Sequence, residues 1–149
     1  MPAPNRFMAM AFEQARAAGE RGEVPIGAVI VMGGEVLAKD GNRTRERNDP
    51  TAHAEILAIR AAAAVLEDER LVDADLYVTL EPCTMCAGAI SFARIRRLYY
   101  AANDPKGGAV ESGQRFFASA TCHHAPEVYS GIGEFEAAEM LQTFFRERR

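Results

Sequence analysis

The spacing of hydrophobic residues in the first part of the chain predicts a helix followed by a hairpin of two strands. Apolar side chains recur every three or four positions over residues 5–19, which is typical of a helix with one buried face. The run over residues 24–31 is almost entirely apolar and rich in β-branched residues, as in a buried strand. Gly33-Gly34 then predicts a two-residue turn, and residues 35–39 predict the returning strand.

Helices and strands alternate over the remainder of the chain. The expected helices cover residues 52–65, 83–92 and 134–147, and the expected strands cover 75–80, 97–101 and 127–129. Strands joined through helices pair in parallel, with helices on both faces of the sheet. Together with the hairpin, this pattern predicts an α/β fold, a three-layer α/β/α sandwich around a mixed five-stranded sheet. No repeat or linker interrupts residues 1–149, so we expect one domain.

Size and composition agree with a single domain that works inside a cell. A chain of 149 residues with 48% hydrophobic residues can bury an ordinary core. No apolar run approaches the ~20 residues of a membrane span, and no secretory apolar segment follows the N-terminus. Three cysteines, two of them in a motif described below, argue against a disulfide framework. We therefore expect a cytoplasmic protein without membrane contact.

Basic residues gather in a few segments although the whole chain is acidic. The net charge of −4 does not by itself suggest a nucleic-acid-binding protein. The basic clusters are Arg43, Arg45 and Arg47; Arg94, Arg96 and Arg97 with Lys106; and Arg146, Arg148 and Arg149. Such clusters could form a phosphate-binding face, and ordinary solvated charges are the alternative interpretation.

Two short motifs, His-Ala-Glu and Cys-Thr-Met-Cys, carry the candidate chemistry. The imidazole of His53 and the thiolates of Cys83 and Cys86 form a three-ligand set for Zn²⁺ with a fourth position left for water or substrate. That arrangement is typical of catalytic rather than structural zinc sites. The carboxylate of Glu55, two positions after the histidine, is then free for proton transfer.

Both motifs are expected at the start of a helix. Thr51 is a good N-cap, so the helix that carries the histidine should begin near Ala52. Pro82 suits the first position of the helix that carries both cysteines, which are three positions apart and hence on one face. Two helix N-termini would then direct their positive dipole ends at one point, which favours thiolates over thiols.

Each part of the zinc motif also has a simpler interpretation. A lone histidine is often a surface residue, and Cys-x-x-Cys occurs in redox sites and in four-ligand structural zinc sites. The chain holds no second Cys-x-x-Cys or His-x-x-His pair to complete a structural site, and a redox role leaves His53 and Glu55 unexplained. Cys122 is left over, as an inert thiol or, with the adjacent His123 and His124, as a second metal contact.

The pattern H-x-E…P-C-x-x-C is shared by zinc nucleobase deaminases of the cytidine-deaminase-like superfamily. The matching segments extend beyond that motif and cover residues 24–28, 41–43, 49–55, 76–90, 93–95, 104–109 and 144–146. Over nearly its whole length the chain resembles the bacterial tRNA-specific adenosine deaminase family. The resemblance implies a cytidine-deaminase-like fold, a homodimer, and hydrolytic conversion of adenosine to inosine at the wobble position of an arginine tRNA anticodon.

The resemblance also assigns roles at the reacting centre. It implies that His53, Cys83 and Cys86 bind one Zn²⁺ per chain and that Glu55 carries protons. Asn42 matches the family residue that hydrogen-bonds the flipped base. From the residues alone, an asparagine after a glycine would more simply cap a loop.

Further contacts with the tRNA anticodon stem-loop are implied for five residues. Asp104 and Lys106 match positions that meet the ribose and the flanking backbone, and Phe144, Phe145 and Arg146 match a C-terminal element that meets the anticodon loop. Adjacent phenylalanines on a helix cannot both face the core equally. One should therefore pack, and the other could stack on a base.

Two other functions remain open on the sequence alone. A small-molecule deaminase of cytosine, guanine or a nucleoside would share the same zinc site, so only the substrate pocket and the basic surface discriminate it. A non-enzymatic, zinc-stabilised binding module is the other alternative. The carboxylate of Glu55 argues against that module, because a structural site has no use for an unligated carboxylate.

Overall fold

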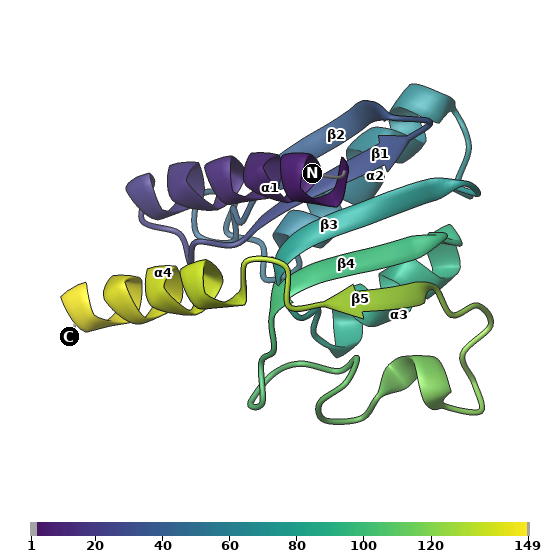
Figure 1. Cartoon of the computed structure of the whole chain (residues 1–149). Coiled ribbons are helices and arrows are strands. Elements are labelled where there is room, and N and C mark those ends of the chain that lie inside the picture. Colours follow the sequence, from purple (N-terminus) through teal and green to yellow (C-terminus); the bar gives the residue numbers. More distant parts are fainter. Residues whose placement is uncertain (1–2, 149) are drawn as a thin grey trace.

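The computed structural model describes residues 3–148, in which four α-helices accompany five strands (Figure 1). The helices are α1 (Ala3–Glu20), α2 (Ala54–Leu66), α3 (Thr84–Ala93) and α4 (Glu134–Glu147), with a short 3-10 helix η1 (Phe116–Ala118). The strands are β1 (Gly27–Met32), β2 (Glu35–Gly41), β3 (Ala74–Leu80), β4 (Arg97–Ala102) and β5 (Glu127–Ser130). Every helix and strand expected from the sequence pattern is confirmed, with some ends shifted by a few residues.

β3 lies at the centre of a sheet with the strand order β2-β1-β3-β4-β5. β1 pairs antiparallel with both β2 and β3, whereas β3, β4 and β5 run parallel to one another. The predicted mixed five-stranded sheet is therefore confirmed. β1 and β2 are joined by the predicted tight turn at Gly33 and Gly34, whose φ angles of 58° and 82° carry no steric cost for glycine.

Helices cover both faces of the sheet and complete the three expected layers (Figure 1). α1 and α4 lie over one face, and α2 and α3 lie over the other. Along β1, Ala28 and Ile30 join the core beneath α2 and α3, while Val29 and Val31 join the core beneath α1 and α4. Burial on both faces fixes the register of β1, because a slip of one residue would exchange the two sets.

The carboxyl ends of β3 and β4 lie at one end of the sheet, and the two sequence motifs gather there. β3 ends at Leu80, just before Cys83, and the start of α2 lies beside it. Sites in α/β sheets commonly lie beyond the carboxyl ends of the strands. Arg97 begins β4 and so lies at the opposite end, which separates the cluster of Arg94, Arg96 and Arg97 from the motifs.

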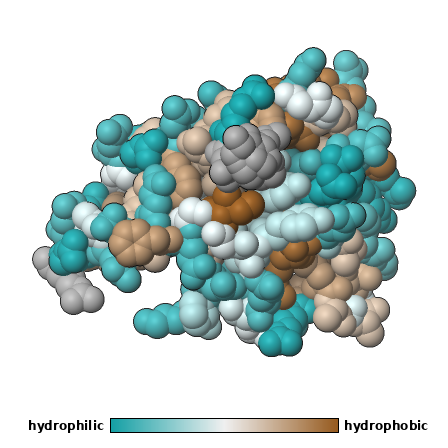
Figure 2. Space-filling view, viewed as in Figure 1, coloured by the Kyte–Doolittle hydropathy of each residue, from teal (hydrophilic) through white to brown (hydrophobic). Residues whose placement is uncertain are grey.

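The surface over α1 and α4 is mixed in character. Figure 2 shows hydrophobic side chains reaching this face in several separate places, with hydrophilic side chains between them. Scattered exposure of this kind is ordinary for a folded chain. Within residues 3–148, no helix has both the length and the apolar character that a membrane span requires.

Candidate active site

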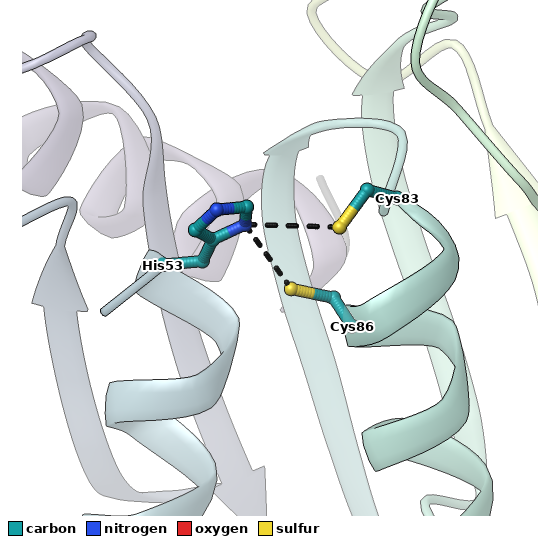
Figure 3. Close-up of side chains that lie close together, drawn as sticks. All are labelled: His53, Cys83 and Cys86. Atoms are coloured by element: carbon teal, nitrogen blue, oxygen red, sulfur yellow. Dashed lines mark hydrogen bonds between the residues drawn. The ribbon is translucent and has the colours of Figure 1, made fainter. Parts of the chain in front are cut away.

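The imidazole of His53 and the thiols of Cys83 and Cys86 converge on one point (Figure 3). Nδ1 of His53 lies 3.7 Å from Sγ of Cys83 and 3.5 Å from Sγ of Cys86. All three donor atoms lie within 4.8 Å of one another. In the described part of the chain, no other group of three His, Cys, Asp or Glu side chains could share a metal ion. The convergence predicted from the two motifs is confirmed.

His53 is itself the N-cap of α2, in an extended backbone conformation with φ −75° and ψ 153°. The prediction that Thr51 caps a helix beginning near Ala52 is wrong. The hydroxyl of Thr51 donates a hydrogen bond to Oδ1 of Asp49 at 2.7 Å and is held by that turn. α2 therefore begins only at Ala54, and the histidine stands just outside its first turn.

Cys83 has the corresponding place at α3, as an extended N-cap with φ −76° and ψ 178°. The prediction that Pro82 begins this helix is wrong, because the first helical residue is Thr84. Cys86 lies in the first turn, so both cysteines remain next to the helix N-terminus. Two N-termini, of α2 and α3, thus border the donor atoms, and their dipoles favour negative charge there.

The geometry of the three donors fits a tetrahedral zinc ion. Zn–N bonds of about 2.0–2.1 Å and Zn–S bonds of about 2.3 Å separate nitrogen and sulfur ligands by about 3.6 Å. The observed separations are 3.5 and 3.7 Å. A hydrogen bond from Cys86, together with His53, lowers the pKa of the Cys83 thiol to about 4, so a thiolate is present at neutral pH. The cluster is typical of a deaminase zinc site, with one coordination position left over.

Glu55 lies in the first turn of α2 and is 4% exposed. Its Oε1 atom is buried and has no hydrogen-bond partner among the described residues. Burial raises the pKa of this carboxyl to about 7. A carboxyl group balanced between its two protonation states near neutral pH is suited to take up a proton and return it. The unpaired oxygen is what a group that works on a bound ligand would present.

Asn42 is buried at the end of β2 and is connected to the start of α2. Its Oδ1 atom accepts a hydrogen bond from the backbone N–H of Ala54 at 2.9 Å. Its own backbone N–H donates to Ile26, and its carbonyl accepts from the Arg21 guanidinium. The loop-capping role expected from the sequence is therefore present. The side-chain NH₂ group, at the other end of the amide, is left to meet a ligand.

Asp104 and Lys106 share a surface depression of about 560 Å³ with Phe145. Leu80, at the end of β3, and Ile26, before β1, form part of its apolar wall. Leu80 comes three positions before Cys83 in the sequence, but none of the three donors lines the depression. Three of the five residues implied to contact RNA are thus brought together by the fold.

The two adjacent phenylalanines near the end of α4 differ as the sequence predicted. Phe144 is 9% exposed and packs beneath the guanidinium of Arg148, which lies 3.7 Å from its ring centroid. Phe145 is 51% exposed and lines the depression. Arg146 is exposed and donates a hydrogen bond to Thr143 on its own helix. Contact of these residues with RNA stays a prediction.

Several basic residues of the predicted clusters are paired with acids. Arg43 contacts Asp40 and Glu46, each at 2.8 Å. Arg96 and Arg97, which lie away from the motifs, pair with Asp75 and Glu127. These two clusters therefore present less free positive charge than the sequence suggests.

Cys122, His123 and His124 lie outside the cluster of donors. The thiol of Cys122 donates to the carbonyl of His124 at 3.1 Å, and Nε2 of His124 lies 2.7 Å from the carbonyl of Ile95. The ring of His123 packs near Phe92. Of the two alternatives for these residues, their contacts are those of a structural segment beside α3.

Sequence reasoning missed two buried carboxylates beside the pocket. Glu23 accepts hydrogen bonds from the backbone N–H groups of Arg45 and Glu46 at 3.1 and 2.8 Å. Glu81 is 2% exposed and accepts six hydrogen bonds from residues 103–112. Burial would raise its pKa, but these bonds lower it to about 2. For Glu81 the available signal was an acid directly after an apolar strand, where burial requires partners. Glu23 precedes β1 and offered no such signal.

The fold and the site together define a cytidine-deaminase-like zinc deaminase. Residues 4–149 match the model of the MafB19-like deaminase family. A tRNA-specific adenosine deaminase of Agrobacterium fabrum is 71% identical over 96% of this chain and 94% of that protein. The chain belongs to the tRNA-specific adenosine deaminase family.

Solved structures agree with this assignment. A structure from a study of A-to-I editing by tRNA:A34 deaminases at the wobble position superposes with a TM-score of 0.90 and 70% identity, over 91% of this chain and 99% of that one. A guanine deaminase of Bacillus subtilis superposes with a TM-score of 0.66 and 43% identity, over 69% of this chain and 66% of that one. Deaminases of different substrates thus share this architecture.

Proposed function

We propose that this protein hydrolyses adenosine to inosine at the wobble position of a tRNA anticodon, and that its substrate is an arginine tRNA. The observation that carries the chemistry is the buried carboxyl of Glu55, whose Oε1 has no hydrogen-bond partner among the described residues, near the three convergent donors. Membership of the tRNA-specific adenosine deaminase family supports the choice of substrate. The reaction consumes one water and releases one ammonia for each adenosine.

His53, Cys83 and Cys86 would hold one zinc ion per chain, which supplies Lewis acidity and makes bound water nucleophilic at neutral pH. Glu55 takes the proton of the attacking water and delivers it to N1 of the adenine ring as the water oxygen joins C6. The same carboxyl then takes the remaining proton from the hydroxyl at C6 and passes it to the exocyclic amino group, which leaves as ammonia while the C6 oxygen becomes a carbonyl. One group acts first as base and then as acid, which a pKa of about 7 supports.

Asn42, Asp104 and Lys106 would bind the substrate around this centre. The free NH₂ group of Asn42 is directed by its bond to Ala54 and can donate to an acceptor on the base edge. Lys106 and Asp104 line the depression, where a ribose and its phosphate would lie. Phe145 offers an exposed ring for stacking, and Arg146 an exposed charge for the anticodon loop.

The depression also favours an RNA substrate over a free base. It opens beside the exposed end of α4 and is lined by Lys106 and Phe145, so it offers room for nucleotides that flank the reacting base. Deamination of a free base is the alternative function, because a guanine deaminase shares this architecture. Its substrate would leave Lys106 and Phe145 without a partner.

The deciding assay compares an anticodon stem-loop carrying the wobble adenosine with free cytosine, guanine, cytidine and adenosine. We expect inosine in the stem-loop and no turnover of the small molecules. A stem-loop with guanosine in place of the adenosine controls for ammonia from other sources. Turnover of a free base without turnover of the RNA would replace this proposal with the small-molecule one.

We infer a homodimer formed through α3. Met85 and Phe92 are 37% and 69% exposed, and with Gly88 and Ala89 they form an apolar stripe along that helix. The stripe begins next to Cys86, so a second chain there would border the active site. Light scattering should give a dimer for the wild type and a monomer for Phe92→Glu. The matched control is Phe135→Glu on α4, where 79% of the phenylalanine is already exposed. A monomeric wild type would contradict this proposal.

The same proposal includes one deaminase domain over residues 1–149, acting in the cytoplasm. The family model covers residues 4–149, and one sheet with helices on both faces accounts for the described elements. The location follows from the substrate, because tRNA is modified and used in that compartment. Fractionation of cells with an antibody against the protein tests it, and recovery with the membranes would contradict it.

A further inference from the structure

The loop between β4 and η1 carries Asp104 and Lys106 but has little regular structure of its own. No strand or long helix supports residues 103–115, and Asp104 contributes one local turn by accepting from the N–H groups of Lys106 and Gly107 at 3.2 and 3.0 Å. A segment of this kind needs another anchor if its side chains are to meet a ligand at fixed positions.

The buried carboxylate of Glu81 supplies most of that anchor, beside a bond from the Ala109 N–H to the Pro82 carbonyl and one from the Tyr100 hydroxyl to Glu111. Oε1 accepts hydrogen bonds from the Asp104 N–H at 2.9 Å, the Ser112 hydroxyl at 2.9 Å and the Asn103 amide at 3.4 Å. Oε2 accepts from three consecutive N–H groups, those of Val110, Glu111 and Ser112, at 3.0, 2.8 and 2.8 Å. One side chain thus gathers both ends of the loop.

The contact is tight as well as polar. A Cβ atom added at Gly108 would lie 2.5 Å from Cδ and 2.6 Å from Oε1 of Glu81. Glycine is therefore required where the loop passes over the carboxylate. Glu81 also lies between Leu80, which lines the depression, and the turn that carries Cys83.

We propose that Glu81 is a positioning residue for RNA, which holds Asp104 and Lys106 in place without touching the substrate. The inference rests on the proposed function, because it assumes that Lys106 contacts the RNA. The competing explanation is that Glu81 supports only the turn between β3 and α3, which carries the zinc ligand Cys83. The two differ in what they predict for zinc content and for substrate affinity.

Glu81→Gln is the informative variant. A glutamine has one oxygen and one NH₂ group, so one set of three donors would face another donor. We expect about one zinc per chain as in the wild type, a KM for the stem-loop raised about 10-fold, and kcat changed by less than about 3-fold. Amide hydrogen exchange should accelerate at Asp104 and residues 110–112, while the amides of α3 stay protected.

A double-mutant cycle with Lys106→Ala tests whether Glu81 acts through the loop. We expect Lys106→Ala to raise KM about 10-fold alone but less than about 2-fold in the Glu81→Gln background, because the lysine is already misplaced there. The matched control is Glu23→Gln, another buried carboxylate that anchors a different loop. Its effect and that of Lys106→Ala should add.

The outcomes separate this inference from the proposed function. Loss of zinc from Glu81→Gln, or an additive cycle, overturns the positioning role and leaves the proposed function intact. If Lys106→Ala alone leaves KM unchanged, Lys106 does not contact the RNA. That result overturns the inference about Glu81 as well, because the inference assumes this contact. If Glu81→Gln does not fold, Ser112→Ala and Gly108→Ala replace it in the same cycle. An additive result with both would equally overturn the proposal.

Discussion

The side-chain oxygen of Asn42 accepts a hydrogen bond from the backbone N–H of Ala54, at 2.9 Å. Ala54 is the first residue of α2 and stands between His53, a donor in the metal cluster, and Glu55, the buried carboxyl. One amide therefore satisfies a free N–H at the helix terminus and is fixed in orientation by doing so. Asn42, which is proposed to bind the base, therefore also supports the start of α2, where His53 and Glu55 lie.

The two ends of the Asn42 amide can be separated by mutation. Asn42→Asp keeps an acceptor for the Ala54 N–H but loses the donor for the base, so we expect wild-type zinc content and kcat/KM reduced about 100-fold or more. Asn42→Ala loses both, and its free energy of unfolding should fall by about 1 kcal/mol or more because the N–H is left unpaired. Urea denaturation and the stem-loop assay measure the two effects. Equal activity of Asn42→Asp and the wild type would remove Asn42 from base recognition.

Glu55→Gln should separate proton transfer from metal binding. The amide is close in shape to the carboxyl but cannot carry protons, so turnover should fall by at least about 10²–10⁴-fold. Zinc content, measured by elemental analysis, should stay at one per chain, because Glu55 is not one of the three convergent donors. Normal turnover in this variant would show that another group moves the protons.

Cys83 and Cys122 are a matched pair for testing the metal site. Both thiols are half-buried, but only Cys83 lies in the cluster with His53 and Cys86. Cys83→Ala should therefore lose most of its zinc and its activity, since two remaining ligands bind the ion far more weakly. Cys122→Ala should keep both. Zinc retained by Cys83→Ala under a competing chelator would disprove the ligand assignment.

Phe144 and Phe145 should differ in what each contributes. Phe144→Ala removes a packed ring and should lower the free energy of unfolding by about 2–3 kcal/mol. Phe145→Ala removes a half-exposed ring, so stability should change by less than about 0.5 kcal/mol while KM for the stem-loop rises. Thermal denaturation and steady-state kinetics distinguish the two. An unchanged KM for Phe145→Ala would argue against stacking on the RNA.

The stability contributed by Glu81 should depend on pH. Its pKa is about 2 in the folded protein, against an ordinary value of 4.5, because the loop N–H groups bind the ionised form in spite of burial. A lowered pKa gives stability that is complete above about pH 4.5 and lost as the pH falls toward 2. The difference in unfolding free energy between wild type and Glu81→Gln should therefore shrink by about 2 kcal/mol over that range. Zinc content is measured for both proteins at each pH, so that loss of the metal in acid is separated from the titration of Glu81. A difference that does not change with pH would contradict the role of the ionised carboxylate.

The features predicted correctly from the sequence depend on local spacing. α4 begins and ends at the predicted residues because its apolar residues repeat with the helical period, although the buried ones are Ala137 and Phe144 and not Phe135 or Phe145. The zinc donors were found because each motif is short and its spacing is itself the chemical signal. Their meeting across α2 and α3 then needed only that both helices begin at the same end of the sheet.

The features predicted wrongly or missed depend on competition or on distant partners. Thr51 is a good N-cap by residue type, but the neighbouring Asp49 takes its hydroxyl. The hydrogen-bond donors to Glu81 lie 22 to 31 positions further along the chain, and no periodic pattern in the sequence predicts them. The cluster of Arg94, Arg96 and Arg97 also turned out to lie away from the zinc motifs. Arg97 begins β4, whereas Leu80, which precedes the cysteine motif, ends the parallel strand β3.

The turn at Gly33 and Gly34 joins the strand ends farthest from the reacting centre, since Met32 pairs with Ala74 at the start of β3 while Ala28 pairs with Val78 near its end. Both glycines are exposed, and neither has a neighbouring atom within 4 Å of an added Cβ position. A fluorescent reporter or an immobilisation handle built into this tip would be carried by a rigid ribbon. Such a handle would leave the opposite end of the sheet open to a large polymer in solution.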